Sequence, residues 1–264
     1  MTTATARVRA YGPALLLYVA LFVLWQFGTQ ALHVPRYVLP TPSDIVAGST
    51  RHPDALLGAS WVTIVEVLEG FLLGVVVSIP LGLAIASSRT VERLVYPLLV
   101  AFQAIPKVAL APIMVVWFGF GPGSKVTLGF VTAMFPIVIN TVIGLRQTPP
   151  EMIHLMRSLG ASPLQTFLKV RLFAAAPALF GGFKVGITLA VVGAVVGEFI
   201  ASNKGLGNML LAANNAMDTP LLFGIVVVLS VISIALFYLV ELIEILVLPR
   251  PLRRKGELTP GRGA

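Results

Sequence analysis

TPPEMIHLMRSLGASPLQTFLKVR, residues 148–171, is a polar segment that lies between two apolar stretches of membrane-spanning length. Thr148-Pro-Pro-Glu151 and Ser162-Pro-Leu-Gln165 both have the pattern of a capping box, in which two side chains satisfy free backbone N–H groups at the start of a helix. Gly160 between them tolerates left-handed backbone and is a typical helix end. The segment is therefore predicted to form a helix, a glycine turn and a second helix that runs into the next apolar stretch.

The rest of the chain has the composition of an integral membrane protein. Of its 264 residues, 57% are hydrophobic and 11% are charged, whereas soluble domains are about a quarter charged. A helix needs about 20 residues to cross the hydrocarbon of a bilayer. Six spans are predicted, near 11–32, 60–87, 94–118, 125–146, 173–200 and 219–247, although Glu66 and Glu69 lie close to the start of the second. The expected fold class is an all-α integral membrane protein.

The basic residues indicate how these spans are oriented. With the N-terminus in the cytoplasm, thirteen of the lysines and arginines outside the spans fall on the cytoplasmic side and four on the other side. Because cytoplasmic loops are enriched in basic residues, both termini and residues 148–171 are predicted to be cytoplasmic. The net charge of +8 is spread along the borders of the spans, so no nucleic-acid partner is expected.

The first helix of the polar segment carries an apolar stripe at helical spacing, formed by Met152, Leu155, Met156 and Leu159. Two interpretations fit this stripe. It is either a docking surface for another protein or the lipid-facing side of a helix pair that lies on the headgroups, with basic side chains reaching the interface.

The segment resembles the cytoplasmic signature loop of ABC importer permeases. The family pattern is Glu-Ala-Ala, three residues, Gly, nine residues, then Ile-x-Leu-Pro. In this chain Gly160 is followed after nine residues by Val170-Arg171-Leu172-Phe173, and His154-Leu155-Met156 stands in place of Glu-Ala-Ala. Phe173 replaces the proline, and the salt bridge of the family's first glutamate is not carried over to His154.

Three other blocks resemble the nitrate/sulfonate/taurine branch of these permeases. They are Val38–Ser43 (VLPTPS), Ala104–Gly121 (AIPKVALAPIMVVWFGFG), and Gly193–Phe199 (GAVVGEF) together with Gly205-Leu-Gly207. The resemblance covers about residues 35–250 and implies a type I ABC importer permease architecture. It divides the chain into residues 1–58, with the first span and an extracytoplasmic loop, a permease domain at 59–248 with coupling helices at 148–171, and a basic cytoplasmic tail at 249–264.

The resemblance also implies partners and a location. Such permeases form homodimers in the bacterial cytoplasmic (inner) membrane, bind two cytoplasmic ATPase subunits and receive solute from an extracytoplasmic substrate-binding protein. The coupling loop would comprise Glu151, His154, Met156, Arg157, Gly160, Ala161 and Ser162. Gly119-Phe-Gly-Pro-Gly-Ser-Lys125 lacks the spacing of a P-loop, so ATP with Mg²⁺ is expected on a separate subunit and no cofactor or catalysis on this chain.

Ionisable residues within spans are costly and mark paths or partners. The candidate translocation path contains Lys107, Lys184 and Glu198, with Trp117 and Phe135 as aromatic neighbours. The alternatives, ion pairs between helices for the charges and packing for the aromatic rings, stay open.

Two other function classes make different demands on the sequence. A stand-alone secondary transporter would need no docking element, and a membrane enzyme would need a cluster of His, Asp or Glu side chains, which the three histidines do not suggest. The transported solute is left open between nitrate, sulfonates or taurine and a vitamin precursor such as riboflavin or hydroxymethylpyrimidine.

Overall fold

The computed structural model describes residues 3–248, with side chains described at Pro13 and from Leu16 onward. All regular elements in these residues are helices, which confirms the all-α fold class. They are α1 (Thr3–Ala31), α2 (Pro42–Ser49), α3 (Pro53–Ser87), α4 (Arg89–Ala104), α5 (Lys107–Phe118), α6 (Pro122–Arg146), α7 (Pro150–Ser158), α8 (Pro163–Thr166), the π-helical segment η1 (Phe167–Arg171), α9 (Leu172–Ala201), α10 (Leu206–Asn215) and α11 (Thr219–Val247). The predicted tail at 249–264 lies outside the described residues.

Four described helices are long and apolar enough to cross a membrane. They are α3, α6, the continuous helix Pro163–Ala201 and α11. These four correspond to the second, fourth, fifth and sixth predicted spans. The first predicted span lies in α1, whose apolar part with described side chains, Leu16–Ala31, is shorter than the other four.

The third predicted span, 94–118, was wrong as a single helix. The residues form α4 and α5, which meet at an angle of 100°. Together the two helices have the length and hydropathy of one broken span. Ile105 takes an extended conformation because a residue that precedes a proline avoids the helical region. The residues before and after Ile105-Pro106 are mainly apolar, so the hydropathy pattern did not reveal the change of helix direction.

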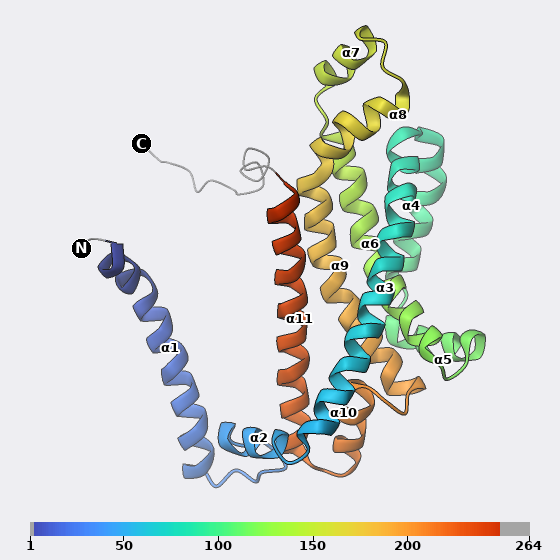
Figure 1. The fold of residues 1–264 in the computed structure, drawn as a ribbon. Helices are drawn as coiled ribbons and strands as arrows, with labels where there is room; N and C mark the ends of the chain where they lie inside the picture. The colour runs from blue at the N-terminus through green and yellow to red at the C-terminus, as the bar shows by residue number, and fades with distance from the viewer. Residues whose placement is uncertain (1–2, 249–264) are drawn as a thin grey trace.

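Helices α3, α6 and α9 form the packed centre of the molecule, and α11 lies against α9 (Figure 1). Small residues let the backbones of these helices approach one another closely. A Cβ atom added at Gly70 on α3 would lie 2.8 Å from the backbone oxygen of Val126 on α6, so only glycine fits there. This packed centre holds the two ends of the molecule at a fixed separation.

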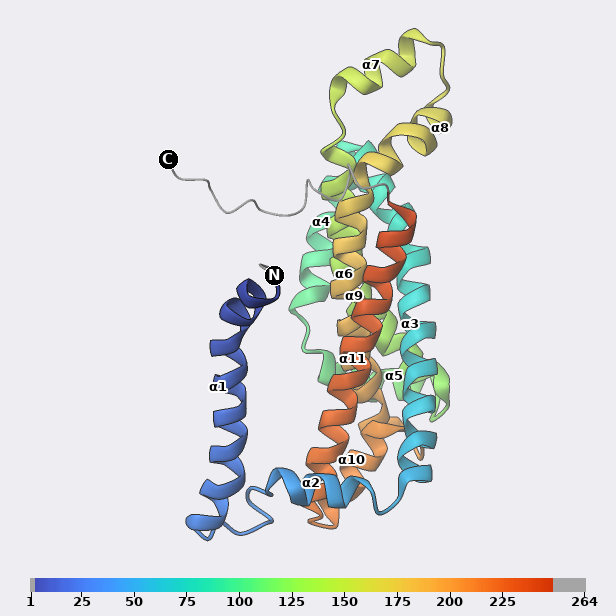
Figure 2. The ribbon, with the colours of Figure 1, turned by 60° about the vertical axis from the view of Figure 1, so that its left-hand side comes forward.

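The two ends carry different elements (Figures 1 and 2). Helices α7 and α8 project beyond one end, and α2 and α10 lie at the other. Helix α1 stands apart from the packed centre in both views and joins it through α2. At that junction the Gln26 side chain donates to Ser43 Oγ at 2.9 Å and accepts from the Ser43 backbone N–H at 3.1 Å.

Candidate functional site

The predicted helix–glycine–helix is present at the end of the molecule that carries α7 and α8. Gly160 has φ +71°, and the N–H groups of Gly160 and Ala161 donate to the carbonyls of Arg157 and Met156, both at 3.0 Å. This pair of bonds is the Schellman arrangement, which ends a helix with a left-handed residue. Gly160 therefore sets the turn between α7 and α8.

The second predicted capping box is confirmed and the first was wrong. The Ser162 hydroxyl accepts from the Gln165 N–H at 3.2 Å, and the Gln165 side chain accepts from the Ser162 N–H at 2.9 Å. At the start of α7, Pro149 is the N-cap and no side chain caps the helix. The Thr148 hydroxyl instead donates to the Leu145 carbonyl at the end of α6.

Helix α7 has no buried residue. Three members of its predicted apolar stripe are exposed, with Met152 at 46%, Leu155 at 59% and Leu159 at 72%. Leu164 on α8 is 66% exposed. Met156 is half-buried, as is Ile153 one turn before it. Ile153 lines a pocket of about 340 Å³ between α7 and the end of α3. The apolar side chains on α7 and α8 therefore form a surface that the described residues leave uncovered.

The other predicted coupling residues surround this surface. Glu151, His154 and Ser162 are exposed, and Ala161 is half-buried. Arg157 is exposed and also lines the pocket beside Ile153.

The residues predicted for a translocation path are not gathered in one place. The Lys107 ammonium donates to the carbonyls of Phe102, Gln103 and Ile105 at 3.1–3.3 Å and so caps the broken end of α4. On α9, the Lys184 ammonium lies 2.7 Å from the Glu244 carboxylate of α11 and 5.7 Å from the centre of the Phe237 ring.

The two aromatic candidates also lie apart. Trp117 on α5 is 68% exposed, whereas Phe135 packs against the cluster formed by α3, α4 and α6.

Glu198 belongs to a group of buried polar residues at the opposite end of the molecule, most of which the sequence analysis missed. The Thr63 hydroxyl donates to Glu198 Oε1 at 2.6 Å, and the Gly207 N–H donates to Glu198 Oε2. Lys125 Nζ lies 2.6 Å from Glu66 Oε1. A sequence signal did exist, because Glu66 is an ionisable residue inside an apolar span, but its partner on α6 could not be identified from hydropathy.

The same contacts join two of the sequence blocks quoted above. A Cβ atom added at Gly205 would collide with the Glu198 carboxyl group, and one added at Gly207 would lie 2.8 Å from it. Gly205 also has φ +92°. Gly193–Phe199 and Gly205-Leu-Gly207 are thus two halves of one contact, in which the start of α10 closes over Glu198.

Within residues 3–248, no group of three or more His, Asp or Glu side chains is placed to hold a metal ion. The arrangement offers an exposed apolar surface at one end, a buried charged contact at the other, and a bundle of membrane-spanning helices between them.

Comparisons with known proteins agree with this architecture. Residues 78–252 match the family described as binding-protein-dependent transport system inner membrane component. The chain is 39% identical to the riboflavin transport system permease protein RibX of Chloroflexus aurantiacus, over 92% of this chain and 94% of the relative. It is 34% identical to the formylaminopyrimidine transport permease protein ThiX of Halalkalibacterium halodurans, over 89% of this chain and 94% of the relative.

A solved structure of the methionine ABC transporter MetNI, in an inward-facing conformation, shares the fold. Its TM-score is 0.68 at 21% identity, and the match covers 76% of this chain and 100% of that chain. The chain therefore belongs to the family of binding-protein-dependent transport system inner membrane components, as a membrane-spanning permease subunit of an ABC importer.

Proposed function

We propose that the α7–α8 surface receives force from cytoplasmic ATPase subunits and passes it to the membrane helices. The observation that carries this proposal is the set of exposed apolar side chains on two short helices that project beyond the bundle. Exposed apolar groups of this kind mark interaction sites. ATP and Mg²⁺ would be bound by the ATPase, and this chain would contribute translocation and no catalysis.

The proposed assembly contains two copies of this chain, two ATPase subunits and a substrate-binding protein. The distribution of basic residues supports a cytoplasmic position for α7 and α8 and for both termini. Helices α2 and α10 would then face the extracytoplasmic side of a bacterial inner membrane, where the binding protein delivers solute. Residues 59–248 would form the permease domain, with residues 1–58 as the peripheral first span and loop.

For the translocation path, the exposed face of α4 and α5 is the best candidate. Lys107 is half-buried at the bend, and Trp117 is largely exposed beyond it. Lys184 and Glu198 are engaged by Glu244 and Thr63, and Phe135 is packed, so these three would stabilise the walls. Uptake that survives Lys107→Arg but falls in Lys107→Met would support a need for positive charge at the bend, and equal uptake by both variants would oppose it.

The proposed solute is a planar nitrogen heterocycle. RibX and ThiX are named for riboflavin and for formylaminopyrimidine, which share this chemistry. Reconstituted vesicles that contain the complete importer would be tested for uptake of labelled riboflavin, a formylaminopyrimidine and taurine. Uptake of taurine alone would contradict the proposal.

The docking proposal is tested with Leu155→Asp, which places a charge in the middle of the apolar surface. We expect the variant to insert and fold normally, since Leu155 is exposed, but to lose copurification with the co-expressed ATPase and lose uptake. Thr50→Asp is the matched control, because Thr50 is an exposed residue at the opposite end. Normal copurification and uptake by Leu155→Asp would overturn the proposal.

A further inference from the structure

Two arginines at the α7–α8 end line one pocket and have no acidic partner. The pocket of about 340 Å³ between α7, α8 and the end of α3 is lined by Arg157 of α7 and Arg171 of η1. Among residues 3–248, no carboxylate lies within ion-pair distance of either arginine, whereas Arg146, also at this end, is paired with Glu92 at 2.7 Å. The positive charge in the pocket is therefore not compensated within the described part of the chain.

The Arg171 guanidinium shows the clearest sign of a missing partner. Its Nε is buried and has no hydrogen-bond partner among the described residues. Buried polar groups are nearly always hydrogen-bonded, and an unpaired donor is most costly when it belongs to a charged group. Arginine cannot lose its proton in a protein, so the Nε needs an acceptor from outside the described residues.

The end of α3 is the alternative partner for these arginines. The last carbonyl groups of a helix carry partial negative charge and attract basic side chains, and Ala86 and Ser87 at the end of α3 line the pocket. No hydrogen bond from Arg157 or Arg171 to these carbonyls is present within residues 3–248. The dipole of α3 therefore leaves the Arg171 Nε unsatisfied.

The chemistry and the level of the pocket favour a phosphate group. The arginine fork matches the geometry of phosphate oxygens, and the pocket is far larger than the roughly 30 Å³ of one water, so a tetrahedral oxyanion fits. Arg171 lies just before the predicted span 173–200, at the level where basic pockets of membrane proteins bind anionic headgroups. We propose that Arg157 and Arg171 bind one phosphate group, supplied by an anionic phospholipid headgroup or by free phosphate.

A phosphate in this pocket would connect separate elements of the chain. Helix α7 has no buried residue, so a shared anion between Arg157 and Arg171 would restrict its motion relative to α9. The wide turn of η1, in which the Leu172 N–H donates to the Phe167 carbonyl, contains Arg171, and π-helical turns are frequent at functional sites. The bound phosphate would thus hold α7 against the start of α9 and the end of α3.

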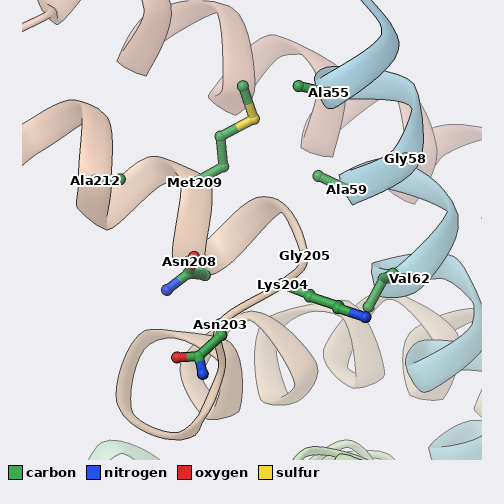
Figure 3. A pocket seen from close by; sticks show the side chains of 10 residues that line it. All are labelled: Ala55, Gly58, Ala59, Val62, Asn203, Lys204, Gly205, Asn208, Met209 and Ala212. Carbon is green, nitrogen blue, oxygen red and sulfur yellow. The ribbon is translucent and has the colours of Figure 1, made fainter.

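The pocket at the α10 end has a different lining (Figure 3). It has a volume of about 490 Å³, and in it Asn203, Lys204 and Met209 face Ala59 and Val62. Lys204 is the only charged residue among the described residues that line it, and it is exposed. This larger pocket has no pair of cations for an anion, so Lys204 provides a control for the loss of one positive charge.

The first test measures phosphate binding by the purified full chain, which needs no ATPase subunit and is therefore separate from the docking test. The chain is placed in phosphatidylcholine nanodiscs, and inorganic phosphate replaces chloride at constant ionic strength. Binding should raise the unfolding temperature, because a ligand of the folded state stabilises it. A second set of nanodiscs contains phosphatidylglycerol, whose headgroup is anionic. Stabilisation by phosphate identifies free phosphate as the source, stabilisation by phosphatidylglycerol alone identifies the lipid, and the absence of both overturns the proposal.

Two variants assign the site. Arg171→Gln and Arg157→Gln should each weaken binding by about tenfold or more, the usual effect of losing a hydrogen bond to a charged group. Arg157 is exposed, so its variant should fold normally. Lys169→Gln is the matched control, because Lys169 is exposed on the same segment as Arg171 and does not line this pocket. Lys169→Gln and Lys204→Gln should bind like the parent chain, and equal weakening in these controls would overturn the proposal.

A third variant separates charge from shape. Arg171→Lys keeps the positive charge but lacks the planar fork, so it should fold like the parent chain and bind phosphate or phosphatidylglycerol more weakly. An acidic side chain of the ATPase is the competing partner for these arginines. In that case the parent chain would respond to neither phosphate source, while Arg157→Gln and Arg171→Gln would lose copurification with the ATPase, and this result would overturn the proposal.

Discussion

The two ends of this molecule are built on opposite principles. At one end, α7 has no buried residue, and the turn between α7 and α8 is set by local hydrogen bonds around Gly160 and Ser162. At the other end, α10 is fastened through Glu198 and Thr63, whose side chains are fully buried. The α10 end is held by buried polar contacts between helices, whereas the α7–α8 end exposes its apolar side chains. Substitutions should therefore affect stability at the α10 end and partner binding at the α7–α8 end.

The largest effect is expected from Lys125→Met. This substitution removes the ammonium from a buried pair and leaves Glu66 without its partner, a change that costs about 3–5 kcal/mol of unfolding free energy. Denaturant titration in lipid nanodiscs measures the loss. Lys204→Met, at an exposed lysine near the same end, should change stability by less than about 0.5 kcal/mol. Equal effects of the two substitutions would show that the buried Lys125–Glu66 pair does not stabilise the α10 end.

Alanine at the two left-handed glycines compares the ends directly. Gly160 and Gly205 both have positive φ, so each substitution carries a backbone cost of about 1–2 kcal/mol. A Cβ at Gly160 meets no atom within 4 Å, while one at Gly205 collides with the Glu198 carboxyl group. Gly205→Ala should be more destabilising by a further 1–3 kcal/mol or so, the usual cost of overpacking. Thermal unfolding of the two variants side by side tests the order.

A smaller effect is expected from the cap of α8. Ser162→Ala removes one side of the capping box and should cost about 1 kcal/mol, confined to the first turn of the helix. Hydrogen exchange at the amides of residues 164–166 should accelerate. Thr148→Ala is the control for the corrected assignment: exchange in α7 should not change, because Thr148 bonds to the end of α6. Faster exchange in α7 would instead support a helix cap made by Thr148.

The smallest change in stability is expected from Leu159→Ala. Leu159 is 72% exposed, so the substitution should alter unfolding free energy by less than about 0.5 kcal/mol while lowering affinity for the ATPase. Leu206→Ala, at a fully buried leucine on α10, should cost about 2–5 kcal/mol. A stable Leu206→Ala chain would remove the distinction between the two ends.

Much of the architecture was predictable because lipid imposes simple rules. The predicted spans at 125–146, 173–200 and 219–247 lie within three residues of the bounds of α6, α9 and α11, since length and hydropathy set them. The α4–α5 break was not predictable in this way. Prolines at 80, 112, 136 and 177 lie inside helices, so Pro106 alone did not distinguish a break from a tolerated proline.

The helix–glycine–helix segment was predictable from Gly160 onward because its signals there are local. Gly160, Ser162 and Gln165 act on neighbours in the chain, and sequence spacing shows such contacts directly. The buried contacts of Glu66, Lys125 and Glu198 were not predictable because these residues come from three helices. Lys125 stands at the start of the predicted span 125–146, and only the packing of α6 against α3 brings it to Glu66.

Helix Pro163–Ala201 is continuous over 39 residues, although the η1 segment gives it one wider turn. At about 1.5 Å per residue it is about 60 Å long, and it carries the α8 cap at one tip and Glu198 near the other. The exposed α8 side of the apolar surface and the buried Glu198 carboxyl group thus belong to one continuous helix. An axial rotation or tilt imposed at α8 would reach Glu198 within one helix, and α10 through the hydrogen bond between Glu198 and Gly207. The wider turn at η1 departs from α-helical register but does not break the helix.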